Sequence, residues 1–212
     1  MNSINYIRLW IVPLYKKVQY LTIEEAKIAS QLPKLKSRQY SFTRSHVRDV
    51  LSKFFNIPAL EIPLEAPPGK PPLLKNELGH ISLGHCNDAL IIGWSKYELG
   101  VDIERKDRKI NAKLIARKFY SSQEKNFLNK TEDELFHYNF LKFWVLKEAA
   151  IKWQKGTIGK DLLYWRIRNE FQEAIHDLEK SKLEAYLYEF KFWLIGLTYK
   201  KYGKQKIIIS KV

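Results

Sequence analysis

The sequence predicts an α+β protein, and three observations favour this class. Apolar, β-branched and aromatic segments typical of strands occur in both halves of the 212-residue chain. Segments with apolar residues at helical spacing accompany them, and the strands form local groups instead of alternating regularly with helices, which argues against a doubly wound fold. A hydrophobic content of 45% is ample for a core. We find no repeat, low-complexity segment or flexible linker, and expect a soluble globular protein.

The first half is predicted to contain a strand, two helices and then three strands. Residues 4–12 are apolar and β-branched, as in a strand. Thr22 with Glu25 three residues later forms a capping box, which predicts a short helix. Apolar residues recur at helical spacing over residues 38–55. Prolines then break regular structure around the turn PPGKPP, and strands are predicted at residues 80–84, 89–95 and 99–104.

The second half is predicted to contain three helices followed by four strands. The first helix is expected at residues 111–120. A second helix is expected to begin after the capping residue Ser121, with Glu124 in its first turn, and a third to cover residues 132–154. The strands are expected at residues 162–168, 185–190, 192–199 and 204–210.

The charge balance predicts a polyanionic partner. Lys and Arg number 37 against 23 Asp and Glu, which gives a net charge of +14. Cys86 is the single cysteine, so no disulfide can form within the chain. The start of the chain lacks the order of a secretory signal, and the longest apolar runs are far short of the ~20 residues of a membrane helix. We therefore expect a cytoplasmic protein.

Two carboxylates are predicted to share one face of a strand in the segment GVDIER. Alternate residues of a strand point the same way, so Asp102 and Glu104 oppose Val101 and Ile103, which face the core. The ordinary interpretation is a solvated strand edge on which the basic residues at positions 105 and 106 pair with the two anions. A functional interpretation requires a third ligand from elsewhere in the chain.

The segment FWVLKEAAIKW supplies a candidate for this third ligand. On a helix Glu148 and Lys152 lie on the same side, and in isolation they predict only an ion pair worth about 0.2–0.5 kcal/mol. Together with Asp102 and Glu104, however, Glu148 would make three carboxylates, which suit a hard divalent cation such as Mg²⁺. A basic protein with one such cluster is suited to hold a metal-bridged polyphosphate.

At these residues the sequence resembles the 4′-phosphopantetheinyl transferase superfamily, specifically its single-chain, surfactin-synthetase-activating type. The GxD(I/V)E strand of that family corresponds to residues 100–104, and its (F/W)xxKE(A/S)xxK helix corresponds to residues 144–152. Weaker similarities lie upstream: Gly69-Lys70-Pro71 matches a GKP turn, Arg44 and Ser45 resemble an early basic helix, and residues 82–86 resemble an (N/S)xSH(S/T) element. In this last element Gly84 replaces Ser and Cys86 replaces Ser or Thr, so one hydroxyl contact to phosphate is expected to be lost.

The resemblance implies two similar α+β halves, residues 1–105 and 106–212, related by a pseudo-two-fold axis with the active site in the cleft between them. It implies transfer of the phosphopantetheine arm of coenzyme A to a serine of an acyl or peptidyl carrier protein. Asp102, Glu104 and Glu148 would bind Mg²⁺, or Mn²⁺ as the alternative. The residues expected to contact coenzyme A are Arg44, Ser45, Lys70, Gly84, His85, Lys147 and Lys152.

Roles in the reaction follow from the same resemblance. Glu148 would act as general base, and Lys152 or Lys147, which the sequence does not separate, would neutralise the departing phosphate. Carrier proteins are typically acidic, so the basic stretch over residues 105–118 is a candidate docking surface, with a solvated helix face as the equal alternative. We expect a monomer that binds neither nucleic acid nor membranes.

Two other interpretations of the sequence are a nucleic-acid-binding module and a carrier-binding protein without catalysis. A nucleic-acid-binding module would use the aromatic and basic residues, but most aromatic residues fall in apolar patterns and no recognised nucleic-acid motif occurs. A carrier-binding protein without catalysis is disfavoured by the intact set of Asp102, Glu104 and Glu148, although the altered residues 82–86 leave it open.

Overall fold

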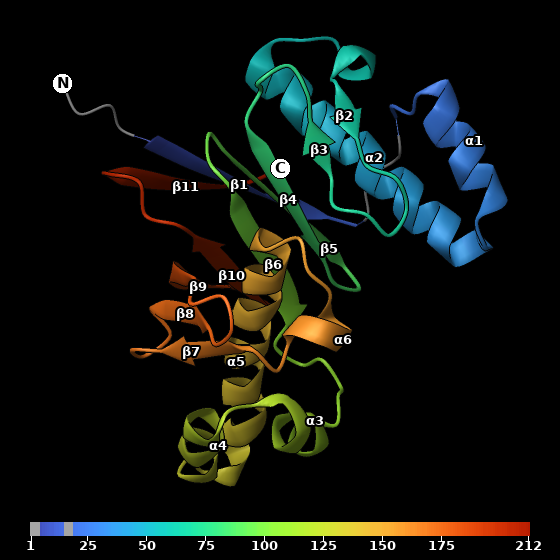
Figure 1. Cartoon of the computed structure of the whole chain (residues 1–212). Coiled ribbons are helices and arrows are strands. Elements are labelled where there is room, and N and C mark those ends of the chain that lie inside the picture. The colour runs from blue at the N-terminus through green and yellow to red at the C-terminus, as the bar shows by residue number, and fades with distance from the viewer. Residues whose placement is uncertain (1–4, 15–18) are drawn as a thin grey trace.

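A computed structural model describes residues 5–14 and 19–212, and its two larger sheets lie against each other (Figure 1). In the first sheet, of order β11-β1-β5-β4, β1 (Asn5–Pro13) pairs parallel with β11 (Gln205–Lys211) and antiparallel with β5 (Ala89–Ser95), and β4 (His80–His85) forms the other edge. Ile4, predicted as the start of β1, lies outside the described residues.

The second sheet has the order β6-β10-β9-β8-β7, and each neighbouring pair is antiparallel. Its strands are β6 (Leu99–Arg105), β7 (Trp165–Arg168), β8 (Glu173–His176), β9 (Lys182–Phe190) and β10 (Trp193–Tyr199). A two-stranded sheet of β2 (Leu64–Glu65) and β3 (Leu73–Leu74) flanks the proline-rich turn.

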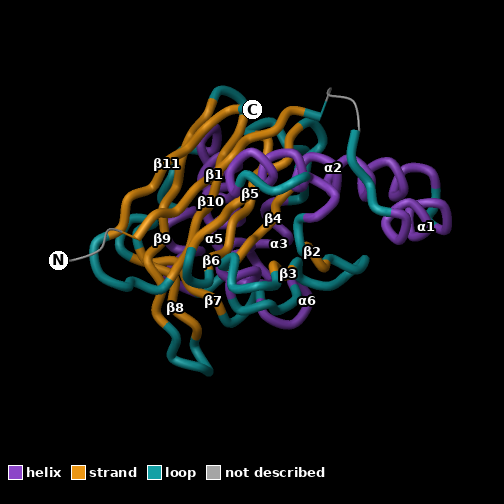
Figure 2. The backbone as a smooth tube through the Cα atoms, turned by 90° about the horizontal axis from the view of Figure 1, so that it is seen from above, coloured by secondary structure: helices purple, strands orange, loops and turns teal. Residues whose placement is uncertain are grey.

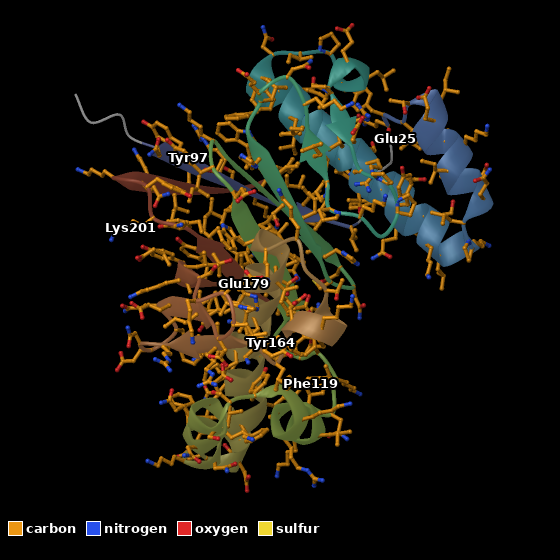
Figure 3. All side chains as sticks on the ribbon, viewed as in Figure 1. Glu25, Tyr97, Phe119, Tyr164, Glu179 and Lys201 are labelled. Carbon is orange, nitrogen blue, oxygen red and sulfur yellow. The ribbon has the colours of Figure 1, made fainter. Side chains whose placement is uncertain are left out.

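The described helices are α1 (Ile23–Gln31), α2 (Lys34–Phe55), the 3-10 turn η1 (Ala59–Glu61), α3 (Ala112–Phe119), α4 (Ser122–Asn129), α5 (Asp133–Trp153) and α6 (Ile158–Asp161). Both predicted capping boxes are present, at Thr22 with Glu25 and at Ser121 with Glu124. Seen from above, α1 lies at the periphery beyond α2 (Figure 2). Glu25, labelled in Figure 3, fixes it there by accepting hydrogen bonds of 2.8 and 3.0 Å from Arg48 of α2.

Three apolar clusters hold these layers together. One cluster lies between the two sheets and contains Val101, Ile103 and Ile195. A second packs α2 on the outer face of the first sheet, and a third packs α3, α4 and α5 on the outer face of the second sheet. The burial of such side chains contributes about 25 cal/mol for each Å² of apolar surface removed from water.

Helix α5 approaches the second sheet closely because two strand residues have no side chain. A Cβ at Gly100 of β6 would lie 1.8 Å from the carbonyl oxygen of Ala149, and a Cβ at Gly196 of β10 would lie 2.5 Å from that of Val145. Both positions therefore require glycine at this helix–strand distance. The close contact sets Glu148 of α5 beside β6.

The α+β class is confirmed, whereas several details differ from the prediction. Helix α2 begins at Lys34 instead of residue 38, the strand predicted at residues 162–168 is shorter, and α6 and β8 were not predicted. In each of the two larger sheets a strand from residues 1–105 pairs with a strand from residues 106–212, since β6 pairs with β10 and β1 pairs with β11. The pseudo-two-fold relation and the two domains stay predictions. In the described part of the chain, no helix has the length and apolar character needed to span a membrane.

Candidate functional site

Strand β6 buries two carboxylates on the face that it turns toward α5. Val101 and Ile103 point into the apolar cluster between the sheets, as the strand alternation predicted. Asp102 and Glu104 on the opposite face are only 2% and 8% exposed. A solvated strand edge is therefore wrong for these residues, because burial of an anion is costly unless it finds a counter-charge or a metal.

Glu148 of α5 completes a cluster with these two residues. One carboxylate oxygen from each of Asp102, Glu104 and Glu148 lies within 4.8 Å of the others. The structure thus brings together the three residues that the sequence predicted as metal ligands, although Glu148 of α5 lies more than forty positions after Glu104 of β6 in the chain.

Two cations face this cluster. Lys152 Nζ donates a hydrogen bond of 2.6 Å to Asp102 Oδ1, and the guanidinium of Arg108 pairs with Glu104 Oε1. The pairing expected from positions 105 and 106 is wrong: Arg105 bonds to Asp88 and Asp107, and Lys106 bonds to Glu189. The sequence analysis did not identify Arg108 as a partner of Glu104, although the spacing of four residues between them was a usable signal.

Electrostatics and an unpartnered oxygen fit a divalent cation at the cluster. Burial and then the charge of Asp102 raise the pKa of Glu104 to about 7 and that of Glu148 to about 8, although Arg108 and Lys152 oppose the shift. Asp102 Oδ2 is buried without a hydrogen-bond partner among the described residues. Three clustered carboxylates, two of them with a raised pKa and one with an unpartnered oxygen, match the oxygen donors that Mg²⁺ or Mn²⁺ requires.

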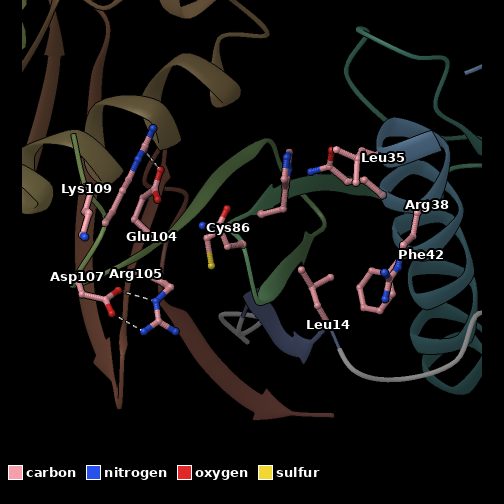
Figure 4. A pocket seen from close by; sticks show the side chains of 13 residues that line it. Leu14, Leu35, Arg38, Phe42, Cys86, Glu104, Arg105, Asp107 and Lys109 are labelled. Atoms are coloured by element: carbon pink, nitrogen blue, oxygen red, sulfur yellow. Dashed lines mark hydrogen bonds and ion pairs between the residues drawn. The ribbon is translucent and has the colours of Figure 1, made fainter. Parts of the chain in front are cut away.

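Two cavities include His85 in their lining. The first, named here the Arg44 cavity, has a volume of about 570 Å³, and its lining includes Arg44, Lys70, His85 and Lys152. The second, the Arg108 cavity, has a volume of about 970 Å³ and is shown in Figure 4. Its lining includes Arg38, His85, Glu104, Arg105, Arg108 and Lys109. The carboxylate cluster thus contributes Glu104 to one cavity and contacts the other through Lys152.

Four of the predicted cofactor-binding residues share the Arg44 cavity. The buried guanidinium of Arg44 lies 4.7 Å from the centre of the Tyr40 ring and donates to the carbonyl oxygen of Ala66. Lys70 lies in the proline-rich turn and is exposed. Burial and then the charge of Lys152 lower the pKa of His85, so its ring is neutral at pH 7.

Ser45 and Gly84 lie outside the lining of both cavities. Ser45 Oγ accepts hydrogen bonds of 2.7 and 2.9 Å from the backbone N–H groups of Gln19 and Tyr20. A Cβ at Gly84 would lie 2.8 Å from the Cα of Asp102, so the glycine lets β4 approach β6. Ser45 thus holds a neighbouring backbone segment, and Gly84 allows the close packing of β4 on Asp102, without lining either cavity.

Lys147 points away from the carboxylate cluster. Its side chain is fully buried, and Nζ lies 3.0 Å from Glu124 Oε2 and 4.7 Å from the centre of the Tyr120 ring. Glu124 also accepts hydrogen bonds from the N–H groups of Ser121 and Ile167. The structure does not bring Lys147 to either cavity; the residue joins α5 to α4 and β7.

The region around the cluster matches the model of a protein family. Residues 98–202 match the model of the 4′-phosphopantetheinyl transferase superfamily. This match includes Asp102, Glu104, Glu148, Lys147 and Lys152, whereas Arg44, Ser45, Lys70, Gly84 and His85 precede it. A search of curated proteins found no match to the chain.

Proposed function

We propose, from the 4′-phosphopantetheinyl transferase domain at residues 98–202, that this protein converts an apo acyl or peptidyl carrier protein to its holo form. The serine hydroxyl oxygen of the carrier attacks the phosphorus bonded to the pantetheine arm of coenzyme A, the P–O bond of the pyrophosphate breaks, and adenosine 3′,5′-bisphosphate leaves. The observation that carries the proposal is the convergence of Asp102, Glu104 and Glu148 beside two cavities lined with basic residues.

Asp102, Glu104 and Glu148 would hold the Mg²⁺ or Mn²⁺ ion that the family uses. Their oxygen donors suit a hard cation, and the unpartnered Asp102 Oδ2 is available as a ligand. A bound divalent ion would supply charge neutralisation at the pyrophosphate oxygens. The surrounding apolar burial strengthens this interaction, because charges attract more strongly where water is excluded.

The Arg44 cavity is the proposed site for the charged end of coenzyme A. Arg44, Lys70 and Lys152 supply cations, and hydrogen bonds between ionised partners are stronger than those between neutral ones. His85, neutral at pH 7, would donate one ring N–H. We assign supporting roles to Ser45, which fixes the segment before α1, and to Gly84, which seats Asp102 against β4.

Glu148 is the proposed general base. A general base has to lie within hydrogen-bond reach of the proton that it takes, and Glu148 belongs to the cluster at which the pyrophosphate would bind. The carboxylate accepts the serine proton, directly or through a water molecule. Lys152 then neutralises the departing bisphosphate, whereas Lys147 keeps α5 in position through Glu124.

An acidic carrier would be attracted by the net charge of +14. Within residues 105–118, α3 exposes Leu114 beside basic neighbours, which supports this stretch as the docking surface. We propose that a single chain forms the complete site and acts in the cytoplasm. A mass measurement on several apo carriers incubated with coenzyme A and Mg²⁺ tests the function.

A gain of about 340 Da on a carrier, the mass of one phosphopantetheine, would support the enzyme. Coenzyme A binding with unmodified carriers would support a carrier-binding protein without catalysis. Binding of single-stranded nucleic acid without coenzyme A binding would support the nucleic-acid module. The last two outcomes would each overturn the proposed function.

A further inference from the structure

We infer that Arg108 is a built-in counter-ion of the carboxylate cluster, which a divalent cation displaces and which then binds a phosphate group of coenzyme A in the Arg108 cavity. This inference rests on the proposed function, because it takes Asp102, Glu104 and Glu148 as the metal site. It concerns a residue outside both family motifs, in the turn between β6 and α3.

The backbone of Arg108 is fixed while its side chain can change partner. Its N–H donates to the carbonyl oxygen of Arg105 at 3.1 Å, and its own carbonyl oxygen lies 2.7 Å from His137 Nε2. The side chain is 33% exposed at the edge of the Arg108 cavity. A rotamer change alone would therefore carry the guanidinium from the cluster into the cavity, with no movement of the turn.

Arg108 now occupies the place of a metal counter-charge. Its guanidinium pairs with Glu104 Oε1 and lies 5.2 Å from the centre of the Trp144 ring, which holds it over the cluster by a cation–π contact. A buried set of three carboxylates needs compensating charge, and Arg108 with Lys152 provides it. A divalent cation at the same carboxylates would repel the guanidinium and take over its role.

Arg108 is better suited to this exchange than the neighbouring Arg105, because the two residues have different carboxylate partners. Arg105 lines the same cavity but is held by Asp88 and Asp107. Among the described residues, the salt bridge of Arg108 is with Glu104, a proposed metal ligand. Displacement would thus leave Arg108 as a cation facing the cavity without a carboxylate partner. A planar guanidinium of this kind suits bidentate binding of a phosphate group.

Mn²⁺ titration by calorimetry tests the first half of the inference, with the wild type, Arg108→Gln and Lys109→Gln. Lys109 lines the same cavity and is exposed, so its variant removes the same charge without removing a salt bridge to Glu104. We expect Arg108→Gln to bind Mn²⁺ about tenfold more tightly than Lys109→Gln, because the competing cation is gone. Arg108→Lys, which keeps the charge, should stay within about twofold of the wild type.

Coenzyme A binding to the Mn²⁺-loaded proteins tests the second half. Here the expected effect has the opposite sign: Arg108→Gln binds coenzyme A about tenfold more weakly than Lys109→Gln, since a charge-assisted contact is lost. A general loss of structure would weaken both ligands together and so contradict the inference. Equal Mn²⁺ affinities for the two glutamine variants, or equal coenzyme A affinities, would also overturn it. A wild type that binds no Mn²⁺ would instead overturn the proposed metal site itself.

Discussion

Lys152 Nζ of α5 lies 2.6 Å from Asp102 Oδ1 of β6, although 50 residues separate the two in the chain. This contact joins the helix and the strand that carry the cluster, and it neutralises an aspartate that is only 2% exposed. The same lysine lines the Arg44 cavity. In the proposed function, Lys152 would exchange this carboxylate for a phosphate when a divalent cation and coenzyme A bind.

Replacing Lys152 with Met should destabilise the metal-free protein. Asp102 would be left buried without a counter-charge, which we expect to lower the free energy of unfolding by about 1–3 kcal/mol. Added Mg²⁺ should recover most of this loss by supplying charge at the cluster. Urea unfolding with and without Mg²⁺ measures both effects.

Lys155→Met is the matched control for this prediction. Lys155 pairs with Glu98 at 3.0 Å, and both side chains are about half exposed, so the change should cost about 0–1 kcal/mol with no dependence on Mg²⁺. Equal losses for the two variants would mean that the Lys152–Asp102 pair has no special part in the cluster.

The affinity for Mg²⁺ should depend on pH between 6 and 9. Burial and the charge of Asp102 raise the pKa of Glu104 to about 7 and that of Glu148 to about 8. Protons compete with the metal below these values, so the affinity should rise as the pH increases through 7 and 8 and then level off. Calorimetry in buffers of different ionisation enthalpy would detect proton release on binding; an affinity that is constant over this range would contradict the assigned pKa values.

The same pKa shifts predict that the metal-free protein becomes less stable as the pH rises. A carboxyl group whose pKa is higher in the folded than in the unfolded state keeps its proton longer when folded. Between pH 4.5 and about 8, Glu148 should be ionised in the unfolded chain but protonated in the folded protein, so the free energy of unfolding should fall as the pH rises. Glu148→Gln should show a weaker decline in denaturant titrations over this range. A decline equal to that of the wild type would rule out Glu148 as its source.

Gly100→Ala should separate α5 from β6. Its Cβ would lie 1.8 Å from the carbonyl oxygen of Ala149, and we expect a loss of about 1–3 kcal/mol or more from the forced backbone shift. Because the shift moves Glu148 away from Asp102, the affinity for Mg²⁺ should fall as well. Gly159→Ala in α6, whose Cβ would meet no atom within 4 Å, is the control and should change neither property measurably.

Lys147 and Glu124 should behave as a structural pair. Removing either partner leaves the other charge buried, so Lys147→Met or Glu124→Gln should cost about 3–5 kcal/mol, and the double variant should cost less than the sum. Thermal and denaturant unfolding complete the double-mutant cycle. If Lys147 instead bound phosphate, folded Lys147→Met would lose coenzyme A affinity while Glu124→Gln kept it.

Local patterns predicted the main elements and the three carboxylates. The capping boxes at Thr22 and Ser121 mark helix starts because they satisfy backbone donors within one turn, and strand alternation fixed the shared face of Asp102 and Glu104. The parallel pairing of β11 with β1 depends on contacts between residues about 200 positions apart, and no local pattern encodes it.

The orientation of individual side chains was harder to predict. Adjacent residues on a helix point about 100° apart, so Lys147 faces Glu124 while Glu148 faces β6. The prediction that Lys147 contacts phosphate did not take this difference in direction into account. Arg108 reaches Glu104 only because the turn after β6 folds back, and Ser45 is occupied by a segment that precedes it by 25 residues. These contacts arise from tertiary packing.

The most direct test of the account is the intact mass of an apo carrier protein incubated with coenzyme A and each of four proteins: the wild type, Asp102→Ala, Glu148→Gln and the control Asp107→Ala. Asp107 is an exposed carboxylate bound to Arg105, close to the cluster in sequence but outside it. Circular dichroism would establish that all four are folded.

The account predicts a gain of about 340 Da with the wild type and Asp107→Ala in Mg²⁺, and none when EDTA is added. Asp102→Ala and Glu148→Gln should give no product while remaining folded. Normal turnover by either variant, or by the wild type in EDTA, would contradict the claim that these carboxylates hold the metal for phosphopantetheine transfer.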